Sequence, residues 1–404
     1  MNIAMFSDCY FPRINGVSVS ILSFAEELTK LNHNVIIVCP DYKSKKNLKS
    51  QFKFSYEEIQ KTKKGSLKLY RLASHRIVFS QEDRLVKITV WHNLKKYLDN
   101  FKPDIIHINT EYMVGRFGSH YAKHRLIPMV YTFHTYWEDY IENYADFAPK
   151  NVSRAFGREI SLYFLKRADK IIAPTKRFEQ VVKSYGINCQ ITVIPTGISD
   201  DIQKYEKNHA NLFFNRIHKI FPIIKKKNIL LYVGRVAKEK NLDFLLEMLG
   251  KVRKTVNDAV LIVVGDGPEL KTLKEKAAKL PYSWNICFTG YSDRDQLAYF
   301  YNLADVFVFP SLTETQGLVT IEAMSNGLPV VAIGEMGTLD VMQGNNGGFM
   351  VNNDIDEFSQ KVIDLLQNPE LRKQKSQEAK EWSKNWSIEN TTQKLLSVYN
   401  SIIK

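Results

Sequence analysis

Cysteine is scarce in this chain of 404 residues, and the few cysteines lie far apart. They are Cys9, Cys39, Cys189 and Cys287, and no two of them form a C-x-x-C pair. This spacing argues against the usual zinc-binding motifs and against the dense disulfide framework of a small secreted protein. We therefore expect four reduced, buried thiols and no metal site.

Long apolar runs are also missing. No uninterrupted apolar stretch approaches the roughly 18 residues that suggest a membrane-spanning helix. The N-terminus runs from Met1 directly into the strand-like segment 3–6, without the charged region and the long apolar region of a secretory signal. We expect a cytoplasmic protein that does not span a membrane.

Negative charge is in short supply in the first half of the chain. Residues 1–200 carry 30 lysines and arginines against 19 acidic residues, whereas residues 201–404 carry 26 against 24. Such an excess predicts an anionic partner for the N-terminal half, either nucleic acid or an anionic membrane surface. Part of it lies between Tyr42 and Arg76, where a solvated loop is the alternative. Nucleic acid is the weaker choice, because the basic residues form no recognisable module with interleaved aromatics.

Strand-like apolar runs alternate with helical patterns along the chain, as in parallel sheets covered by helices on both faces. In the first half these runs are 3–6, 35–39, 105–108, 129–133, 171–173 and 191–194. In the second half they are 229–233, 260–264, 286–288, 306–309 and 330–332. The sequence predicts an α/β protein with two doubly wound, Rossmann-like domains that face each other across a cleft. We place the boundary near residue 199, because Pro195 and Gly197 interrupt the pattern there.

Two glutamates eight residues apart follow the predicted strand 306–309. Glu314 falls in the loop, and Glu322 falls in the helix that begins near Gly317. Backbone N–H groups near Gly317 would lie between them, at a helix N-terminus that favours an anion such as a diphosphate. A carboxylate accepts hydrogen bonds from a vicinal diol, so each glutamate suits a sugar or a ribose. The ordinary alternative is that both only complement the helix dipole.

Other strand-to-helix loops carry groups suited to a nucleotide. Arg235 and Lys240 follow the strand 229–233, and a guanidinium and an ammonium both suit a diphosphate. Gly16 lets a backbone approach a phosphate, and Gly290-Tyr291 offers backbone groups to a flat base. The alternatives are that Arg235 and Lys240 lie in a solvated basic loop, and that a glycine is needed at position 16 only for the conformation of the turn. The D-x-D triplets at 293–295 and 354–356 precede helical patterns, so we assign them to capping and not to magnesium.

His134 directly follows the predicted strand 129–133. A site that carries a leaving diphosphate and sugar hydroxyls needs a donor on the face opposite Glu314, which His134 supplies. A buried structural histidine is the alternative. Glu111 follows the strand 105–108, and we place it in the same cleft.

Residues 84–98 have apolar side chains, including Trp91, at helical spacing. The cations Arg84, Lys87, Lys95 and Lys96 lie among them or beside them. This pattern predicts either a helix lying on an anionic bilayer or a helix that packs on the core.

Taken together, Gly16, His134, the cations Arg235 and Lys240, and the Glu314-x7-Glu322 pair resemble the retaining glycosyltransferases of family 4, which have the GT-B fold. The resemblance covers nearly the whole chain. Within the family, segments 133–140 and 313–318 look most like the membrane-associated diacylglycerol glucosyltransferases that make monoglycosyl-diacylglycerol.

The resemblance implies a role for each matching position in the C-terminal half. Arg235 and Lys240 bind the diphosphate of the donor, and Glu322 holds its ribose. Glu314 contacts the transferred hexose. The backbone amides that assist it are those of Gln316, Gly317 and Leu318.

For the N-terminal half, the resemblance implies that Gly16 approaches the diphosphate and that His134 contacts the hexose near the reacting carbon. It also implies that no divalent ion or other cofactor is required. The domains are then 1–199 for the acceptor and membrane, 200–380 for the nucleotide-sugar, and 381–404 for a helix that crosses back to the first domain.

We therefore expect a retaining hexosyltransferase that moves glucose or galactose from a UDP-sugar to 1,2-diacylglycerol, attached peripherally to the inner face of the cell membrane. The acceptor alternatives are a sterol, a polyprenyl-linked saccharide and a soluble sugar. A glycosidase using the two glutamates as acid and base is disfavoured. It needs a carboxyl separation below about 10 Å and gives Arg235 and Lys240 no role. No nucleic-acid partner is expected.

Overall fold

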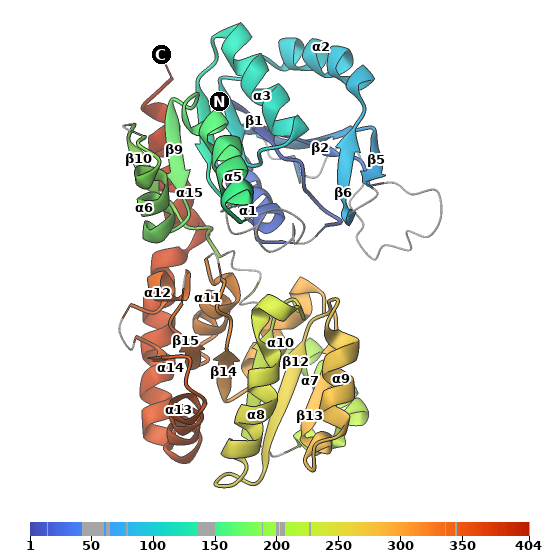
Figure 1. Ribbon diagram of the computed structural model, residues 1–404, viewed down its shortest axis with the longest axis vertical. Helices are drawn as coiled ribbons and strands as arrows, with labels where there is room; N and C mark the ends of the chain where they lie inside the picture. The colour runs from blue at the N-terminus through green and yellow to red at the C-terminus, as the bar shows by residue number, and fades with distance from the viewer. Residues whose placement is uncertain are drawn as a thin grey trace. The chain divides into compact units, whose positions relative to one another are not determined.

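The computed structural model contains two compact units (Figure 1). The N-terminal unit comprises Met1–Gly197 and Ile388–Lys404, and the C-terminal unit comprises Ile198–Ser387. The structure describes residues 1–13, 15–42, 60–61, 65–77, 80–135, 150–187, 189–198, 202, 207–225, 228–314, 316–335, 337–343 and 346–403. The predicted domain boundary at 199 lies outside these residues. So do residues 136–140 of the segment that resembles the diacylglycerol glucosyltransferases. In the described part of the chain, no helix has the length and apolar character needed to cross a membrane.

The N-terminal unit is built on an eight-stranded sheet of order β10-β9-β8-β7-β1-β2-β4-β3. All described pairings are parallel except that of β3 with β4, and β5 and β6 form a separate antiparallel hairpin. The strands are β1 (Asn2–Phe6), β2 (Asn34–Pro40), β3 (Gln60–Lys61), β4 (Ser66–Leu72), β5 (Ser74–Ile77), β6 (Ser80–Val86), β7 (Ile105–Ile108), β8 (Met129–Thr132), β9 (Lys170–Ala173) and β10 (Ile191–Val193). The helices are α1 (Gly16–Lys30), η1 (Ile88–Val90), α2 (Trp91–Phe101), α3 (Met113–Arg125), α5 (Lys150–Leu165), α6 (Lys176–Ser184) and α15 (Ile388–Asn400).

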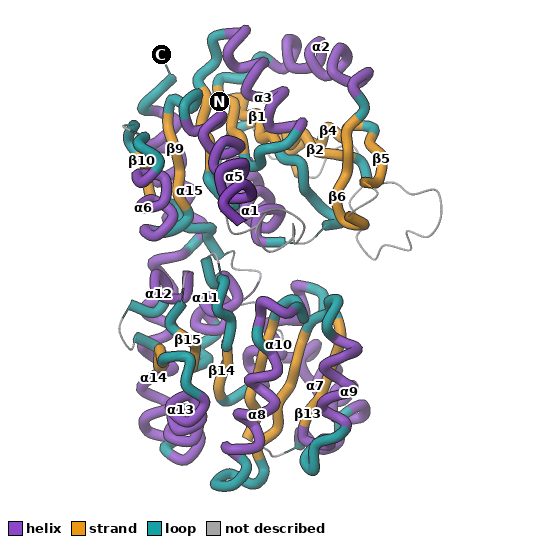
Figure 2. The backbone as a smooth tube through the Cα atoms, viewed as in Figure 1, coloured by secondary structure: helices purple, strands orange, loops and turns teal. Residues whose placement is uncertain are grey.

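Helices cover both faces of this sheet (Figure 2). Alternate residues of β1 belong to different hydrophobic clusters, Ala4 and Phe6 to one and Ile3 and Met5 to the other. A strand buried on both faces reads as a continuous apolar run, because successive side chains point to opposite faces. The run at 3–6 predicted this strand for that reason.

The C-terminal unit has a six-stranded parallel sheet of order β13-β12-β11-β14-β15-β16. Its strands are β11 (Asn228–Val233), β12 (Ala259–Val264), β13 (Ile286–Gly290), β14 (Val306–Phe309), β15 (Val330–Ile333) and β16 (Gly348–Val351). Its α-helices are α7 (Lys207–Ile220), α8 (Leu242–Val252), α9 (Leu270–Ala278), α10 (Arg294–Leu303), α11 (Leu318–Ser325), α12 (Gly337–Val341), α13 (Ile355–Gln367) and α14 (Pro369–Ser383). Its 3₁₀ turns are η3 (Pro222–Ile224), η4 (Lys238–Lys240), η5 (Ser283–Asn285) and η6 (Lys384–Trp386).

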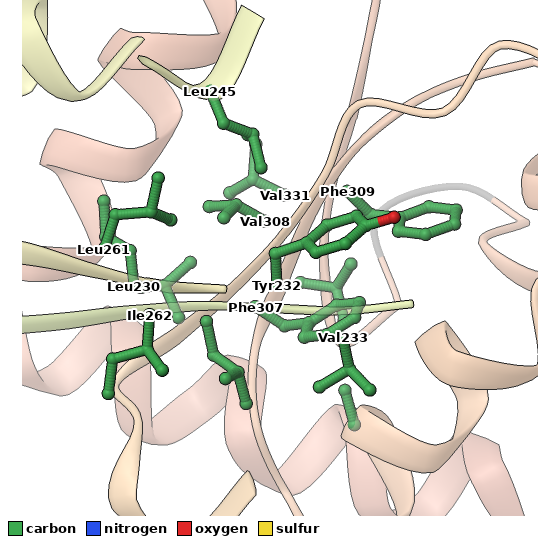
Figure 3. Close-up of a cluster of buried hydrophobic side chains, with 14 of the residues drawn as sticks. Leu230, Tyr232, Val233, Leu245, Leu261, Ile262, Phe307, Val308, Phe309 and Val331 are labelled. Atoms are coloured by element: carbon green, nitrogen blue, oxygen red, sulfur yellow. The ribbon is translucent and has the colours of Figure 1, made fainter. Parts of the chain in front are cut away.

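Aromatic rings fill the centre of this sheet (Figure 3). Tyr232 of β11 stacks on Phe309 of β14 with ring centroids 6.2 Å apart, and Phe309 lies 6.0 Å from Phe307 on the same strand. All three side chains are buried. These rings fix β11 against β14, the two strands whose following loops carry Lys240 and Glu314.

Each sheet has one point where the strand order reverses. In the C-terminal unit, β12 and β13 lie on one side of β11, whereas β14 lies on the other. In the N-terminal unit the order reverses at β1, which has β2 on one side and β7 on the other. Ligands of open α/β sheets bind beyond the carboxyl ends of the strands at such switch points. Two doubly wound units were predicted, and this prediction is confirmed.

The sequence prediction missed β3, β4 and the β5–β6 hairpin in the first unit and β16 in the second. Ser66–Leu72, within the stretch assigned to a basic loop, is strand β4 of the main sheet. It lies near the sheet edge and is only partly buried, so Lys68 and Arg71 interrupt its apolar pattern. In the second unit the missed strand, β16, is a short edge strand that begins with glycine.

The helix predicted over 84–98 begins only at Trp91. Arg84 lies in β6, where it is paired with Arg76 of β5, and Lys87 follows that strand. The first residues of the predicted helix therefore belong to β6, which pairs with β5, and only the later residues form α2. The final helical segment, predicted as 381–404, is also interrupted: α14 ends at Ser383, η6 follows, and α15 starts at Ile388.

Candidate active site

The loops that follow β11, β12, β13 and β14 are joined by hydrogen bonds. The N–H of Gly265 donates to the carbonyl of Gly290 at 2.9 Å, and the N–H of Val236 donates to the carbonyl of Asp266 at 3.0 Å. Asn241 Nδ2 donates to the carbonyl of Pro310 at 3.4 Å. The loops with Arg235, Lys240, Tyr291 and Glu314 therefore form one edge of the C-terminal unit.

Lys240 and Glu314 meet at the switch point of this edge. Lys240 Nζ lies 2.7 Å from Glu314 Oε2, and the two side chains are 18% and 19% exposed. Charge-assisted hydrogen bonds of this length are stronger than neutral ones, and partial burial limits their screening by salt. The pair joins the loop after β11 to the loop after β14.

Glu314 also accepts a hydrogen bond from its own loop. The N–H of Gly317 donates to Glu314 Oε1 at 3.3 Å. Burial favours protonation of this carboxyl, but Lys240 and the N–H groups of Gly317 and Gln316 together hold its pKa below the ordinary value. The sequence predicted that backbone N–H groups near Gly317 are free to bind a diphosphate. For the N–H of Gly317 this prediction is wrong, because Glu314 accepts its hydrogen bond. Glu314 is a carboxylate at neutral pH.

Gly317 sets the direction in which α11 leaves this loop. Its φ of +73° lies in the left-handed region, which glycine adopts without the penalty that a Cβ brings. Leu318 is the first residue of α11, and Gln316 is buried beside the turn. The predicted helix start is confirmed.

Glu322 lies in α11 and is buried against α10. Tyr301 donates its hydroxyl to Glu322 Oε2 at 3.0 Å, and Arg294 NH2 lies 3.5 Å from Glu322 Oε1. Burial raises the pKa of Glu322, while Arg294 and Tyr301 act in the opposite direction. Sequence reasoning missed both partners, because Tyr301 reads as an ordinary core residue of an amphipathic helix.

Arg235 and Tyr291 are more exposed than the two glutamates. The Arg235 guanidinium is 3.9 Å from Glu239 Oε1, and the Tyr291 side chain is exposed after β13. The two D-x-D triplets occupy helix starts. Asp354 accepts hydrogen bonds from the N–H groups of Asp356 and Glu357, which confirms its capping role, whereas Asp293 occupies the N-cap position of α10 without a side-chain capping bond.

His134 lies just beyond β8 in the N-terminal unit. Its Nε2 is buried and has no hydrogen-bond partner among the described residues. Burial lowers the pKa of His134 to about 4. The imidazole is therefore neutral at pH 7.

At the switch point of the N-terminal sheet, the structure adds a residue that sequence reasoning overlooked. Asp8, which follows β1, accepts hydrogen bonds from the N–H groups of Val114 and Tyr112 and from the Thr110 hydroxyl. Burial raises the pKa of Asp8 and the hydrogen bonds oppose that shift. The sequence feature that could have identified Asp8 is its position just after the first strand.

The other predicted residues of the N-terminal unit have structural partners. Glu111 is buried and accepts a hydrogen bond from the Tyr131 hydroxyl at 2.5 Å. Gly16 is exposed at the first position of α1, where Asn15 and Ser18 form a capping box. Gly16 thus lies at the N-terminus of α1.

Of the predicted membrane residues, Trp91 faces the core. Its ring stacks on Phe117 with centroids 4.4 Å apart, and Leu94 and Leu98 of the same helix are fully buried. The apolar face of α2 is therefore not available to a bilayer, and the core-facing alternative is correct. Lys95 and Lys96 are exposed, as is Lys87. The Arg84 guanidinium lies 5.0 Å from the centroid of the Tyr42 ring.

The sequence matches two family models. Residues 14–202 match Glycosyltransferase Family 4, and residues 213–382 match Glycosyl transferases group 1. An alpha-monoglucosyldiacylglycerol synthase from Streptococcus pneumoniae is 30% identical over 337 residues, which is 83% of this chain and 71% of that relative. This chain belongs to glycosyltransferase family 4.

A second relative of the glycosyltransferase is the alpha-monoglucosyldiacylglycerol synthase of Acholeplasma laidlawii. It is 29% identical over 385 residues, covering 92% of this chain and 89% of the relative. Among solved structures, Anabaena HepE in complex with UDP-glucose has a TM-score of 0.75 at 15% identity, and the match covers 100% of each chain. The fold of the glycosyltransferase is GT-B, as predicted.

Proposed function

We propose that this glycosyltransferase moves a hexose from a UDP-sugar to the free hydroxyl of 1,2-diacylglycerol at a membrane surface, with retention of configuration. The similarity to two alpha-monoglucosyldiacylglycerol synthases, which extends through both units, carries the proposal. The relatives' names favour glucose as the transferred sugar.

The C-terminal unit binds the donor in this proposal. Arg235 and Lys240 neutralise the diphosphate, Glu322 accepts hydrogen bonds from the ribose, and Tyr291 lies beside the base. Lys240 supports this assignment because its ammonium lies at the switch point, where the loop amides and a cation together favour an anion. Arg235 lies in the loop after β11 with its side chain 46% exposed, and its planar guanidinium suits a diphosphate.

Glu314 holds the hexose as a hydrogen-bond acceptor. Its lowered pKa keeps it ionised at neutral pH, so it does not act as a general acid. The amide of Leu318 assists it from the start of α11, and the N–H of Gln316 helps to hold the Glu314 carboxylate. The ion pair with Lys240 fixes the carboxylate, so that the sugar and the diphosphate are held by one connected group.

His134 contributes a neutral imidazole from the N-terminal unit. Its buried Nε2 suits a hydrogen bond with a hexose hydroxyl near the reacting carbon. Gly16 brings the N-terminus of α1 to the diphosphate, and Glu111 helps to orient the acceptor. The Tyr131 hydrogen bond holds Glu111 in place for this role.

The transfer step exchanges one bond for another at the anomeric carbon. The acceptor oxygen bonds to that carbon on the face from which UDP departs, and the departing phosphate oxygen takes the acceptor proton. Arg235 and Lys240 stabilise the charge that grows on the diphosphate. The step uses no protein nucleophile, no divalent ion and no other cofactor.

The acceptor remains in the bilayer, so the enzyme must reach a membrane surface. The excess of basic residues in the N-terminal half and the exposed Lys87, Lys95 and Lys96 support attraction to anionic lipid. Trp91 does not contribute, because its ring stacks on Phe117 and packs against the core. We place the enzyme at the inner face of the cell membrane.

One incubation tests the proposal. Purified enzyme is mixed with radiolabelled UDP-glucose, UDP-galactose or GDP-mannose and with diacylglycerol vesicles, and the lipid product is identified by mass spectrometry and anomeric NMR. We expect α-monoglucosyl-diacylglycerol from UDP-glucose, with full activity after treatment with EDTA. Labelling of a sterol, a polyprenyl-linked saccharide or a soluble sugar in preference to diacylglycerol would overturn the acceptor assignment.

A further inference from the structure

Helix α7 of the C-terminal unit exposes two large aliphatic side chains, Leu212 at 69% and Ile220 at 54%. The residues are eight positions apart, and at about 100° per residue they are about 80° apart around the helix. Arg216 lies between them, Lys219 lies beside Leu212, and both cations are exposed. We call Leu212, Arg216, Lys219 and Ile220 the α7 strip.

The other side of α7 is already packed. Ala210 and Ile217 are buried, and Phe213 contacts Tyr299 and Phe300 of α10 with ring centroids 5.1 and 4.8 Å apart. A solvated helix normally keeps polar residues on the side that faces away from the core. A single exposed leucine needs no explanation, but two aliphatic residues that flank a cation on one surface are typical of an interfacial helix.

Charge around the strip identifies the kind of partner. Residues 207–227 contain six lysines and arginines and no acidic residue, whereas the other residues of the 201–404 half contain 20 basic against 24 acidic residues. The α7 region is therefore a cationic segment in a half that is otherwise slightly negative. Neither Arg216 nor Lys219 forms an ion pair within the part of the chain that the structure describes.

We propose that the α7 strip docks the C-terminal unit on an anionic lipid bilayer. Leu212 and Ile220 insert between headgroups, and Arg216 and Lys219 pair with lipid phosphates. Nucleic acid fits less well, because aliphatic side chains gain little beside a phosphate backbone. A second copy of the strip fits less well too, because it would bring like charges together. The inference rests on the proposed function, and it gives the donor-binding unit a membrane contact of its own.

Vesicle binding of the full chain tests the inference. The apolar variant combines Leu212→Asn with Ile220→Asn, and the charge variant combines Arg216→Gln with Lys219→Gln. Matched controls from the same unit are Trp284→Gln, which removes another exposed large side chain, and Lys271→Gln on α9 combined with Lys279→Gln at its C-cap. All changed side chains are exposed, and unchanged circular dichroism and melting temperature establish that each variant is folded.

Binding is measured by co-sedimentation with phosphatidylcholine vesicles that contain about 30% phosphatidylglycerol, over a range of salt concentrations. We expect the charge variant to lose about 25-fold in partition coefficient at low salt, roughly fivefold for each cation, and to show a flatter salt dependence. The apolar variant should lose about tenfold and keep the salt dependence of the wild type. The controls should bind like the wild type.

Three results would overturn the docking assignment. The first is that both strip variants bind vesicles as tightly as the wild type, and the second is that the control variants lose as much binding as the strip variants. The third is that the wild-type protein self-associates and that the variant combining Leu212→Asn with Ile220→Asn does not. Turnover of a short-chain diacylglycerol in detergent micelles reports the proposed function without vesicle binding. If the wild type fails there while vesicle binding follows the expected pattern, the proposed acceptor is wrong and the docking assignment stands.

Discussion

The hydroxyl of Tyr399, in the last helix of the chain, lies 2.6 Å from Nδ1 of His107 in the sheet of the N-terminal unit. Nε2 of the same imidazole lies 2.7 Å from the Thr132 hydroxyl at the end of β8. Burial, with a smaller effect from His134, lowers the pKa of His107 to about 3. A neutral imidazole on β7 therefore connects that strand with α15 and with the end of β8. Its partner on β8, Thr132, is two residues before His134.

This arrangement predicts a pH-dependent stability of the N-terminal unit. The folded-state pKa of His107 is below its unfolded value of about 6.5, so below that pH the unfolded chain binds the additional proton. The stabilisation is complete above about pH 6.5 and falls by at most about 1.4 kcal/mol per pH unit on acidification toward pH 3. Urea denaturation at pH 7, 6 and 5 measures it. His107→Gln should flatten the dependence, whereas exposed His120→Gln should not, and equal slopes in both would contradict the assignment.

Lys240→Ala and Glu314→Gln should each lower kcat/KM by about 100-fold or more, because each leaves the partner charge uncompensated beside the donor. Since the two side chains act as a pair, the double variant should lose little more than either single variant. Initial rates with UDP-glucose provide the measurement. Lys251→Ala, which removes an exposed ion pair with Asp356, is the matched control and should retain normal rates. Additive losses in the double variant would show that the pair does not work as a unit.

Tyr301→Phe removes the hydrogen bond to Glu322 Oε2 while leaving the ring in place. If Glu322 holds the ribose, the variant should raise KM for the donor about fivefold with little change in kcat. A 2′-deoxy donor separates positioning from general damage, because it lacks one hydroxyl that Glu322 would accept from. The difference between variant and wild type should shrink with that donor. The same penalty with both donors would indicate a structural role alone.

Two glycines at the ends of β12 and β13 differ in the space around them. A Cβ on Gly265 would lie 1.9 Å from the carbonyl oxygen of Gly234, whereas one on Gly290 would meet no atom within 4 Å. Both have positive φ, at +145° and +74°. Gly290→Ala should therefore cost about 1 kcal/mol of unfolding free energy, and Gly265→Ala more than about 3 kcal/mol. Thermal denaturation ranks them, and similar losses would mean that the loops move apart at little cost.

Much of the fold follows from strands that are buried on both faces. Runs such as 260–264 and 306–309 are apolar throughout, so their positions could be predicted without knowing their neighbours. Strand β4 could not, because it lies near a sheet edge and only Leu67 and Leu72 of its residues are fully buried. For residues 84–98 the apolar spacing fitted a bilayer and a core equally, and only the stacking of Trp91 on Phe117 distinguishes them.

The candidate site was predictable where a side chain lies in the loop that follows a strand. Lys240, Glu314 and His134 belong to this class, because the carboxyl ends of parallel strands share one edge. Tyr301 and Arg294 lie on α10, and no spacing in the sequence relates them to Glu322. The partners of a buried carboxylate depend on how two helices pack, which single-sequence periodicity does not specify.

The division of the chain between the two units has a consequence for biosynthesis. Residues 198–387 form the C-terminal unit from one continuous segment, whereas α15 completes the N-terminal unit from the far end of the chain. Ile388, Leu395 and Tyr399 belong to a hydrophobic cluster that also includes Ile3 and Met5 of the first strand. During translation, the first strand to emerge must therefore wait for the last helix before its core is closed. We expect the domain that is synthesised first to be the one that finishes folding last.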